Sequence, residues 1–136
     1  MFYLKKLTSA INKIMEQMIV GEWLSRYTIQ ADTDNPKTYE HTIVFSRKAN
    51  GIIGYSQERD SGSELVLRLR YDAEDSALTG TWGEKTSLDG AYKGAVFHGA
   101  LQLLLNDTKT QAQGKWVGFN TAHSRVKTGD WHLEKK

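Results

Sequence analysis

Apolar residues recur at helical spacing over the first part of the chain. Between Phe2 and about Val20, apolar residues fall on one stripe and polar residues occupy the opposite face. The stripe consists of Leu4, Leu7, Ile11, Ile14, Met15 and Met18. Intervals of three and four residues are typical of an amphipathic helix. Gly21 ends the pattern, and a residue without Cβ suits the left-handed backbone conformation found at many helix ends.

The rest of the chain alternates short apolar segments with turn-forming residues. From Glu22 onward, segments rich in β-branched and aromatic residues are separated by Gly, Asn, Asp and Ser at close intervals, which indicates an all-β domain. The predicted strands are Glu22–Ile29, Tyr39–Arg47, Ile52–Glu58, Glu64–Tyr71, Ala77–Glu84, Gly94–Leu105, Gln113–Phe119 and Val126–Glu134. Turn chemistry marks the breaks, as at Asn50-Gly51 and Asn106-Asp107.

Alternation within the predicted strands separates a core face from a solvent-facing one. In the fourth strand, three leucines and a tyrosine alternate with Arg68 and Arg70, and in the sixth, Phe97 lies opposite His98. About eight antiparallel strands with short connections favour an up-and-down meander closed into a barrel, because closure removes exposed sheet edges. We therefore predict one N-terminal amphipathic helix, residues 1–20, and a β-barrel domain, residues 21–136.

Composition removes several functional classes. The 136 residues carry 18 Lys and Arg against 16 Asp and Glu, and a net charge of +2 is far below the excess expected of a duplex-binding protein. The absence of cysteine excludes disulfides and thiolate chemistry. No apolar run approaches the roughly 20 residues that cross a bilayer, and the chain does not open with the pattern of a secretion signal. A cytoplasmic location is therefore expected.

The sequence offers no recognisable catalytic or cofactor-binding constellation. The four histidines, at positions 41, 98, 123 and 132, form no metal-type pair such as His-x-His. There is no Gly-x-Ser-x-Gly nucleophile elbow, and no glycine-rich loop leads from a predicted strand into a helix. We therefore predict a non-enzymatic protein without catalytic residues, metal or cofactor.

A glycine two residues before a tryptophan occurs four times. The segments are Gly21-Glu22-Trp23, Gly80-Thr81-Trp82, Gly114-Lys115-Trp116 and Gly129-Asp130-Trp131. One interpretation is structural, because such a glycine lets a barrel strand bend while the indole fills space near one end. The other is that the indoles stack on a ligand, with Trp82 and Trp116 as the candidates.

These segments resemble strand motifs of known small ligand-binding barrels. Leu78–Trp82, Gln113–Gly118 and Thr128–Leu133 are similar to strands of avidin-like and lipocalin-like (calycin-type) proteins. The stretches Ala91–Ala100 and Gly114–Phe119 resemble the barrel behind helix-turn-helix domains in some bacterial regulators. The Gly-x-Trp opening and the final Gly-x-Trp strand are similar to the cyclic-oligonucleotide recognition barrel of CBASS membrane effectors. The resemblance implies a closed barrel with a sensor role.

Several polar and aromatic residues share a predicted strand face with core positions. These candidate ligand-binding residues are Ser25, Tyr27, Tyr55, Gln57, Trp82, Glu84 and Trp116. Parity places Tyr55 and Gln57 on the face of Ile53, which we take to be the core face. A barrel of about eight strands either fills its interior with side chains or holds one small ligand, so both outcomes stay open.

Three further residues are candidates for contact with an anionic ligand. Arg68 and Arg70 lie two residues apart on one strand face, and guanidinium groups bind phosphate bidentately. His98 lies in the stretch that resembles the regulator barrels. The alternatives are a solvated strand face for the arginines and a structural hydrogen bond for His98.

Together these features predict a small-molecule-binding or sensor barrel whose ligand is a nucleotide-type signal in bacterial regulation or antiphage defence. The alternatives are a protein-interaction or oligomerisation module with a fully packed barrel and, more distantly, an enzyme that uses the barrel as a reaction chamber. The N-terminal helix is expected to cap the barrel or to self-associate, because monomers rarely leave a large apolar stripe unburied. Duplex nucleic acid and membrane surfaces are not expected as partners.

Overall fold

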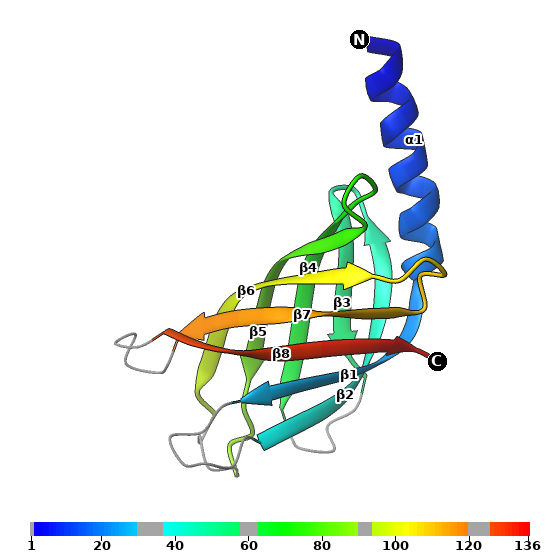
Figure 1. Cartoon of the computed structure of the whole chain (residues 1–136). Helices are drawn as coiled ribbons and strands as arrows, with labels where there is room; N and C mark the ends of the chain where they lie inside the picture. The colour runs from blue at the N-terminus through cyan, green and yellow to red at the C-terminus, as the bar shows by residue number, and fades with distance from the viewer. Residues whose placement is uncertain (1, 30–36, 58–62, 90–93, 120–125) are drawn as a thin grey trace.

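One helix and eight strands make up the described part of the chain, and the computed structural model describes residues 2–29, 37–57, 63–89, 94–119 and 126–136. The helix is α1 (Phe2–Ile19). The strands are β1 (Gly21–Ile29), β2 (Lys37–Lys48), β3 (Gly51–Ser56), β4 (Glu64–Asp72), β5 (Ala77–Lys85), β6 (Val96–Leu105), β7 (Gln111–Phe119) and β8 (Val126–Lys135). Figure 1 shows α1 extending away from one end of the barrel that the strands form.

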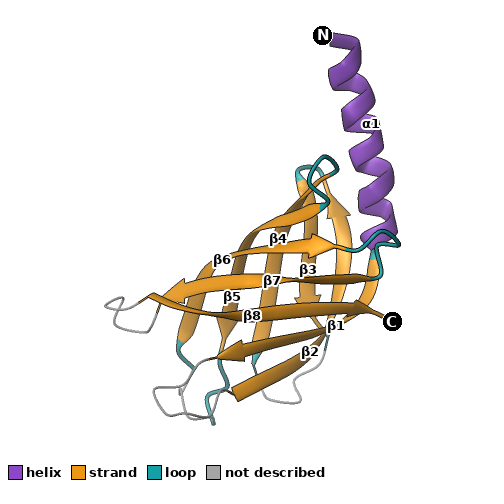
Figure 2. Ribbon diagram, in the orientation of Figure 1, coloured by secondary structure: helices purple, strands orange, loops and turns teal. Residues whose placement is uncertain are grey.

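The sheet closes on itself. Each strand pairs antiparallel with the next along the chain, and β8 returns to pair with β1, from Trp23 opposite Lys135 to Tyr27 opposite Trp131. The predicted all-β, eight-stranded antiparallel meander barrel with one N-terminal helix is thus confirmed (Figure 2). The topology is consistent with the calycin-like barrel that the resemblance implied.

The predicted boundaries agree with the observed ones to within two residues wherever both are described. Gly21 begins β1 with a φ of 127°, a conformation that residues with a Cβ rarely adopt, which explains why the helix ends before it. β6 begins at Val96 rather than at Gly94, because Gly94 lies in a turn with a φ of 81°. The predicted end of the third strand at Glu58, residues 91–93 of the regulator-like stretch and His123 lie outside the described residues.

The barrel interior divides into two chemically different halves. We call the end next to α1 the proximal end and the opposite end the distal end. The proximal half is filled by buried apolar side chains, among them Phe45, Ile52, Leu69, Leu78, Leu103 and Leu133. The distal half carries Tyr27, Tyr39, His41, Trp82, Glu84 and Trp131. Since apolar burial supplies most of the stabilisation of a fold, the polar groups in the distal half are the feature that calls for a functional explanation.

α1 is attached to the proximal end through its last turns. Ile19 is fully buried in the core, and Met15 packs against it. The backbone carbonyl of Ile19 accepts a hydrogen bond of 2.7 Å from the Trp23 indole, and Glu16 forms an ion pair of 3.3 Å with Arg47 of β2. α1 and the barrel therefore share one core at this end. In the part of the chain that the structure describes, no helix combines the length and apolar character needed to cross a membrane.

Candidate functional site

Tyr27 lies at the centre of a group of aromatic rings in the distal half. Its ring centroid is 5.5 Å from that of Tyr39 and 5.8 Å from that of His41, and both rings stack on it. The Trp131 ring lies at 4.9 Å. Strand register produces this group, because Tyr39 and Trp131 lie directly opposite Tyr27 on the two neighbouring strands.

Glu84 of β5 supplies the acidic group of the site. The Tyr27 hydroxyl donates a hydrogen bond to Oε2 of its carboxyl group, and Oε1 has no hydrogen-bond partner among the described residues. Burial raises the pKa of Glu84, and the hydrogen bond from Tyr27 only partly offsets this. No positive side chain in the described ranges contributes to that pKa. An acidic group with a raised pKa is the kind of residue that gathers at binding and catalytic sites.

Trp82 and Trp116 form a second group of aromatic rings in the distal interior, which we call the aromatic wall. The Trp82 indole donates to the backbone carbonyl of Val117, and the Trp116 indole donates to that of Thr28, both at 3.1 Å. The two rings meet edge to face, with centroids 5.5 Å apart. Because each ring is fixed by a hydrogen bond to a strand two places away in the sheet, the wall is preorganised.

Two serines pair with aromatic groups of the site. Ser25 is fully buried, and its hydroxyl accepts a hydrogen bond of 2.8 Å from the Trp131 indole. Ser63, immediately before β4, places its hydroxyl 3.1 Å from Nε2 of His41, and both residues are buried. These pairs satisfy polar groups that would otherwise destabilise the interior.

The structure brings part of the predicted site together. The predicted residues that lie in the distal interior are Ser25, Tyr27, Trp82, Glu84 and Trp116. They come from β1, β5 and β7, which meet there because the barrel is closed. Their contacts fit the structural interpretation of the tryptophan repeats; of the two stacking candidates, Trp82 is partly buried and Trp116 is buried.

The expectation that Tyr55 and Gln57 line the interior is wrong. In β3, Ile52 and Gly54 are buried on one face, whereas Ile53 is only partly buried and Tyr55 is exposed on the other, so the face of Ile53 is the outer face beyond the buried Gly51 at the start of the strand. Tyr55 is accordingly 50% exposed, and Gln57 is exposed as well. The error arose because Ile52 and Ile53 are adjacent apolar residues, and a shift of one residue exchanges the two faces of a strand.

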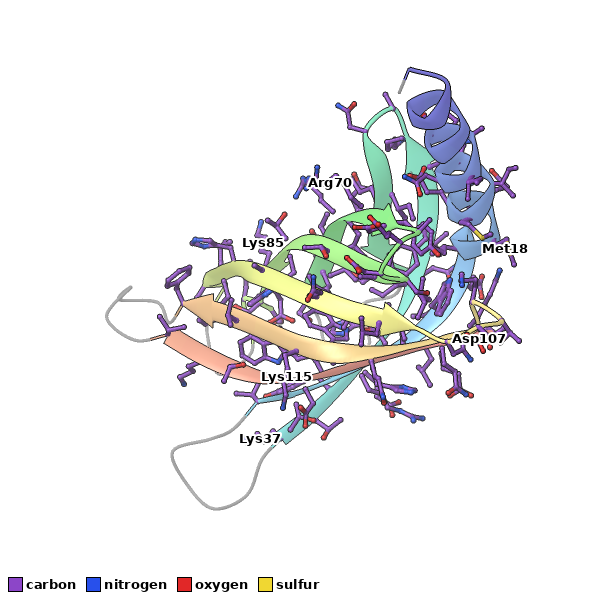
Figure 3. All side chains as sticks on the ribbon, turned by 45° about the horizontal axis from the view of Figure 1, so that its top comes forward. Met18, Lys37, Arg70, Lys85, Asp107 and Lys115 are labelled. Carbon is purple, nitrogen blue, oxygen red and sulfur yellow. The ribbon has the colours of Figure 1, made fainter. Side chains whose placement is uncertain are left out.

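Arg68, Arg70 and His98 also lie outside the distal interior. Both arginines are exposed on the outer face of β4, and Figure 3 shows Arg70 directed away from the barrel. His98 is exposed on β6, with its ring 5.5 Å from that of Phe119 on β7. These three side chains therefore lie on the solvated outer faces of β4 and β6, apart from the group around Tyr27.

Sequence reasoning missed four residues of the site. Tyr39 and His41 have the same parity as Ile43 in β2 and share its buried face, so their parity is a signal that could have identified them. Trp131 belongs to the fourth Gly-x-Trp segment and could have been included with the other indoles. Ser63 precedes β4 and takes part in no alternating pattern, so no sequence signal marked it.

Glu84→Gln is expected to remove a pH-dependent part of the free energy of unfolding. Because the folded-state pKa of Glu84 is raised, its stabilising contribution is fully present below the unfolded-state pKa, near 4.5, and is lost as the pH rises through the folded-state value. The variant should therefore gain stability relative to the wild type as the pH rises from acidic to neutral. Urea unfolding of both proteins across this range measures the difference.

Glu22→Gln, on the exposed face of β1, controls for the loss of one negative charge. A stability difference between wild type and Glu84→Gln that stays constant with pH would contradict the expected titration. So would the same trend in the Glu22→Gln control.

The comparisons with known proteins add no relative to this picture. No protein-family model matches the chain, and no curated protein matches it significantly. The argument for function therefore rests on the geometry of the distal interior. The described residues form a closed eight-stranded antiparallel barrel with one helix, and the candidate site joins a largely buried carboxyl group to tryptophan and tyrosine rings.

Proposed function

We propose that the barrel is a non-enzymatic binding module that holds one small planar molecule at its distal end. The observation that carries the proposal is the Glu84 carboxyl group, which lies largely buried among aromatic rings with one hydrogen bond from Tyr27. A carboxyl group in such surroundings stabilises a fold less than an apolar side chain of similar size. Ligand binding therefore accounts for this residue better than packing does.

The chemistry of the site favours a ligand with a flat ring and N–H donors on its edge. Tryptophan and tyrosine faces stack on heteroaromatic rings, and an ionised carboxyl group accepts hydrogen bonds from ring or amino N–H groups. Trp82 and Glu84 are only partly buried, so both are in contact with solvent rather than sealed in the core. Oε1 of Glu84 is the acceptor we assign to the ligand.

A nucleobase combines a flat ring with N–H donors, and we propose a nucleotide-type signal as the ligand. A phosphate group of that ligand would lie near the start of β8, where Lys127 shares the strand face of Trp131. The exposed Arg68 and Arg70 have no part in this binding mode. Occupancy of the barrel would then serve as a sensor in bacterial regulation or antiphage defence.

The hydrogen bonding of the indoles favours the alternative of a fully packed interaction module. Trp23, Trp82, Trp116 and Trp131 each donate their indole N–H to an acceptor within the protein. In the proposed binding mode the rings therefore contribute only their faces, and Glu84 supplies the polar contact. Binding measurements on Glu84 variants separate the two functions.

The test is isothermal titration calorimetry with cyclic dinucleotides that contain guanine or adenine, and with biotin and a fatty acid as comparison ligands. We expect a nucleotide to bind to the wild type. Glu84→Gln should lower the affinity for that nucleotide about tenfold or more, because a hydrogen bond to a charged group contributes about 1.5–3 kcal/mol. Arg68→Gln, on the outer face, should bind like the wild type. A thermal shift with the same ligands gives a second readout.

Absence of heat and of stabilisation with every nucleotide would overturn the nucleotide assignment. Binding that is lost in Arg68→Gln but kept in Glu84→Gln would place the ligand on the outer face instead. No binding of any ligand, with an intact fold, would favour the packed interaction module.

A further inference from the structure

The apolar stripe of α1 divides into two faces. Met15 and Ile19 face the barrel and pack with its core. Ile11, Ile14 and Met18 remain 40%, 62% and 43% exposed. Figure 3 labels Met18 at the barrel end of the helix, and Figure 1 shows the rest of α1 continuing away from the strands. The barrel therefore covers one face of the helix and leaves the second face in solvent.

The second face has the spacing of a helix–helix seam. Its described apolar positions are Ile11, Ile14 and Met18. In the sequence, Leu4 and Leu7 continue the same alternation of intervals of three and four residues. This is the a and d pattern of a heptad repeat, whose period of 3.5 residues keeps a narrow stripe against a partner helix. Packing against the barrel does not require that period. Met15 and Ile19, which do pack against the barrel, are not part of the heptad pattern.

The positions that flank the seam suit pairing between identical helices. In heptad terms the flanking e and g positions are Thr8, Ala10, Met15 and Gln17. None of them carries a charge, so two copies of the helix would bring no like charges together across the seam. The lysines of the helix occupy the b and c positions, away from the seam.

We infer that the chain self-associates through α1, with the seam of one copy packed against the seam of a second copy. α1 is already ordered in one copy, because Glu16 pairs with Arg47 and the Asn12 side chain accepts a hydrogen bond of 3.3 Å from the backbone N–H of Ala73. Pairing therefore does not have to nucleate the helix, which is the costly step for a short isolated segment. The inference is independent of the distal site, which lies at the other end of the barrel.

Sedimentation equilibrium over a wide protein concentration range tests the inference. The wild type should show a reversible dimer. Ile14→Glu should raise the dissociation constant of this dimer at least about tenfold, because a charge would be buried in the seam. Ser9→Glu adds the same charge on the opposite side of the helix and should associate like the wild type. Ile11→Glu repeats the test at a second seam position, and circular dichroism checks that each variant keeps its fold.

A wild type that stays monomeric at every concentration would overturn the inference. So would a dimer that persists in both Ile14→Glu and Ile11→Glu, because its interface would then lie elsewhere. Flotation of a monomeric wild type with vesicles of mixed neutral and anionic phospholipids, lost in Ile14→Glu, would assign the exposed face to a membrane surface and would likewise contradict self-association.

Discussion

Gly80→Ala is expected to lower the free energy of unfolding by about 3 kcal/mol or more. A Cβ atom at position 80 of β5 would lie 1.8 Å from the backbone carbonyl oxygen of Arg68 on β4. Backbone atoms of a paired strand cannot move aside without breaking the register from Glu64 to Asp72. The substitution therefore forces β4 and β5 apart at this point of the barrel wall.

Gly83→Ala is the matched control in the same strand. No atom lies within 4 Å of the Cβ that this substitution adds, so its effect should stay within about 0.5 kcal/mol. Urea unfolding followed by circular dichroism gives both values, and a thermal melt should place the Gly80→Ala midpoint roughly 10 °C below that of the control. Equal midpoints for the two variants would mean that β4 and β5 approach less closely than described.

Trp23→Ala should destabilise the protein by about 3–5 kcal/mol, because it removes a large, fully buried ring from the proximal core. The indole packs edge to face on Phe45, at a centroid distance of 6.1 Å, and its N–H donates to the carbonyl of Ile19. The substitution thus opens a cavity and detaches the last turn of α1 from the barrel. Urea unfolding measures the loss.

Trp23→Phe separates packing from the hydrogen bond. The phenylalanine retains much of the ring volume but leaves the Ile19 carbonyl without its donor, so we expect a smaller loss, about 1–3 kcal/mol. If α1 and the barrel share one core, helix and strand signals should be lost in the same transition in all three proteins. Separate transitions in the wild type would show that α1 unfolds independently of the barrel.

The sequence by itself determined the elements and most of their faces. Alternation with a period of two residues predicted the strands, because side chains on a strand point to opposite sides and only one side of a barrel wall is buried. In β4 this pattern correctly assigned Leu67 to the core and Arg68 to solvent. In β3 the pattern is ambiguous, because Ile52 and Ile53 are adjacent apolar residues on opposite faces. Taking the face of Ile53 as the core face placed Tyr55 on the wrong side of the strand.

Only the tertiary structure decided which residues form the site. Tyr27 and Glu84 are separated by 57 positions, and Ser25 and Trp131 by 106, yet each pair is joined by a hydrogen bond. Side-chain alternation reports the face of a residue but carries no information on which residue of another strand lies across from it. Register and closure of the barrel set those neighbours, because they depend on pairing along all eight strands at once.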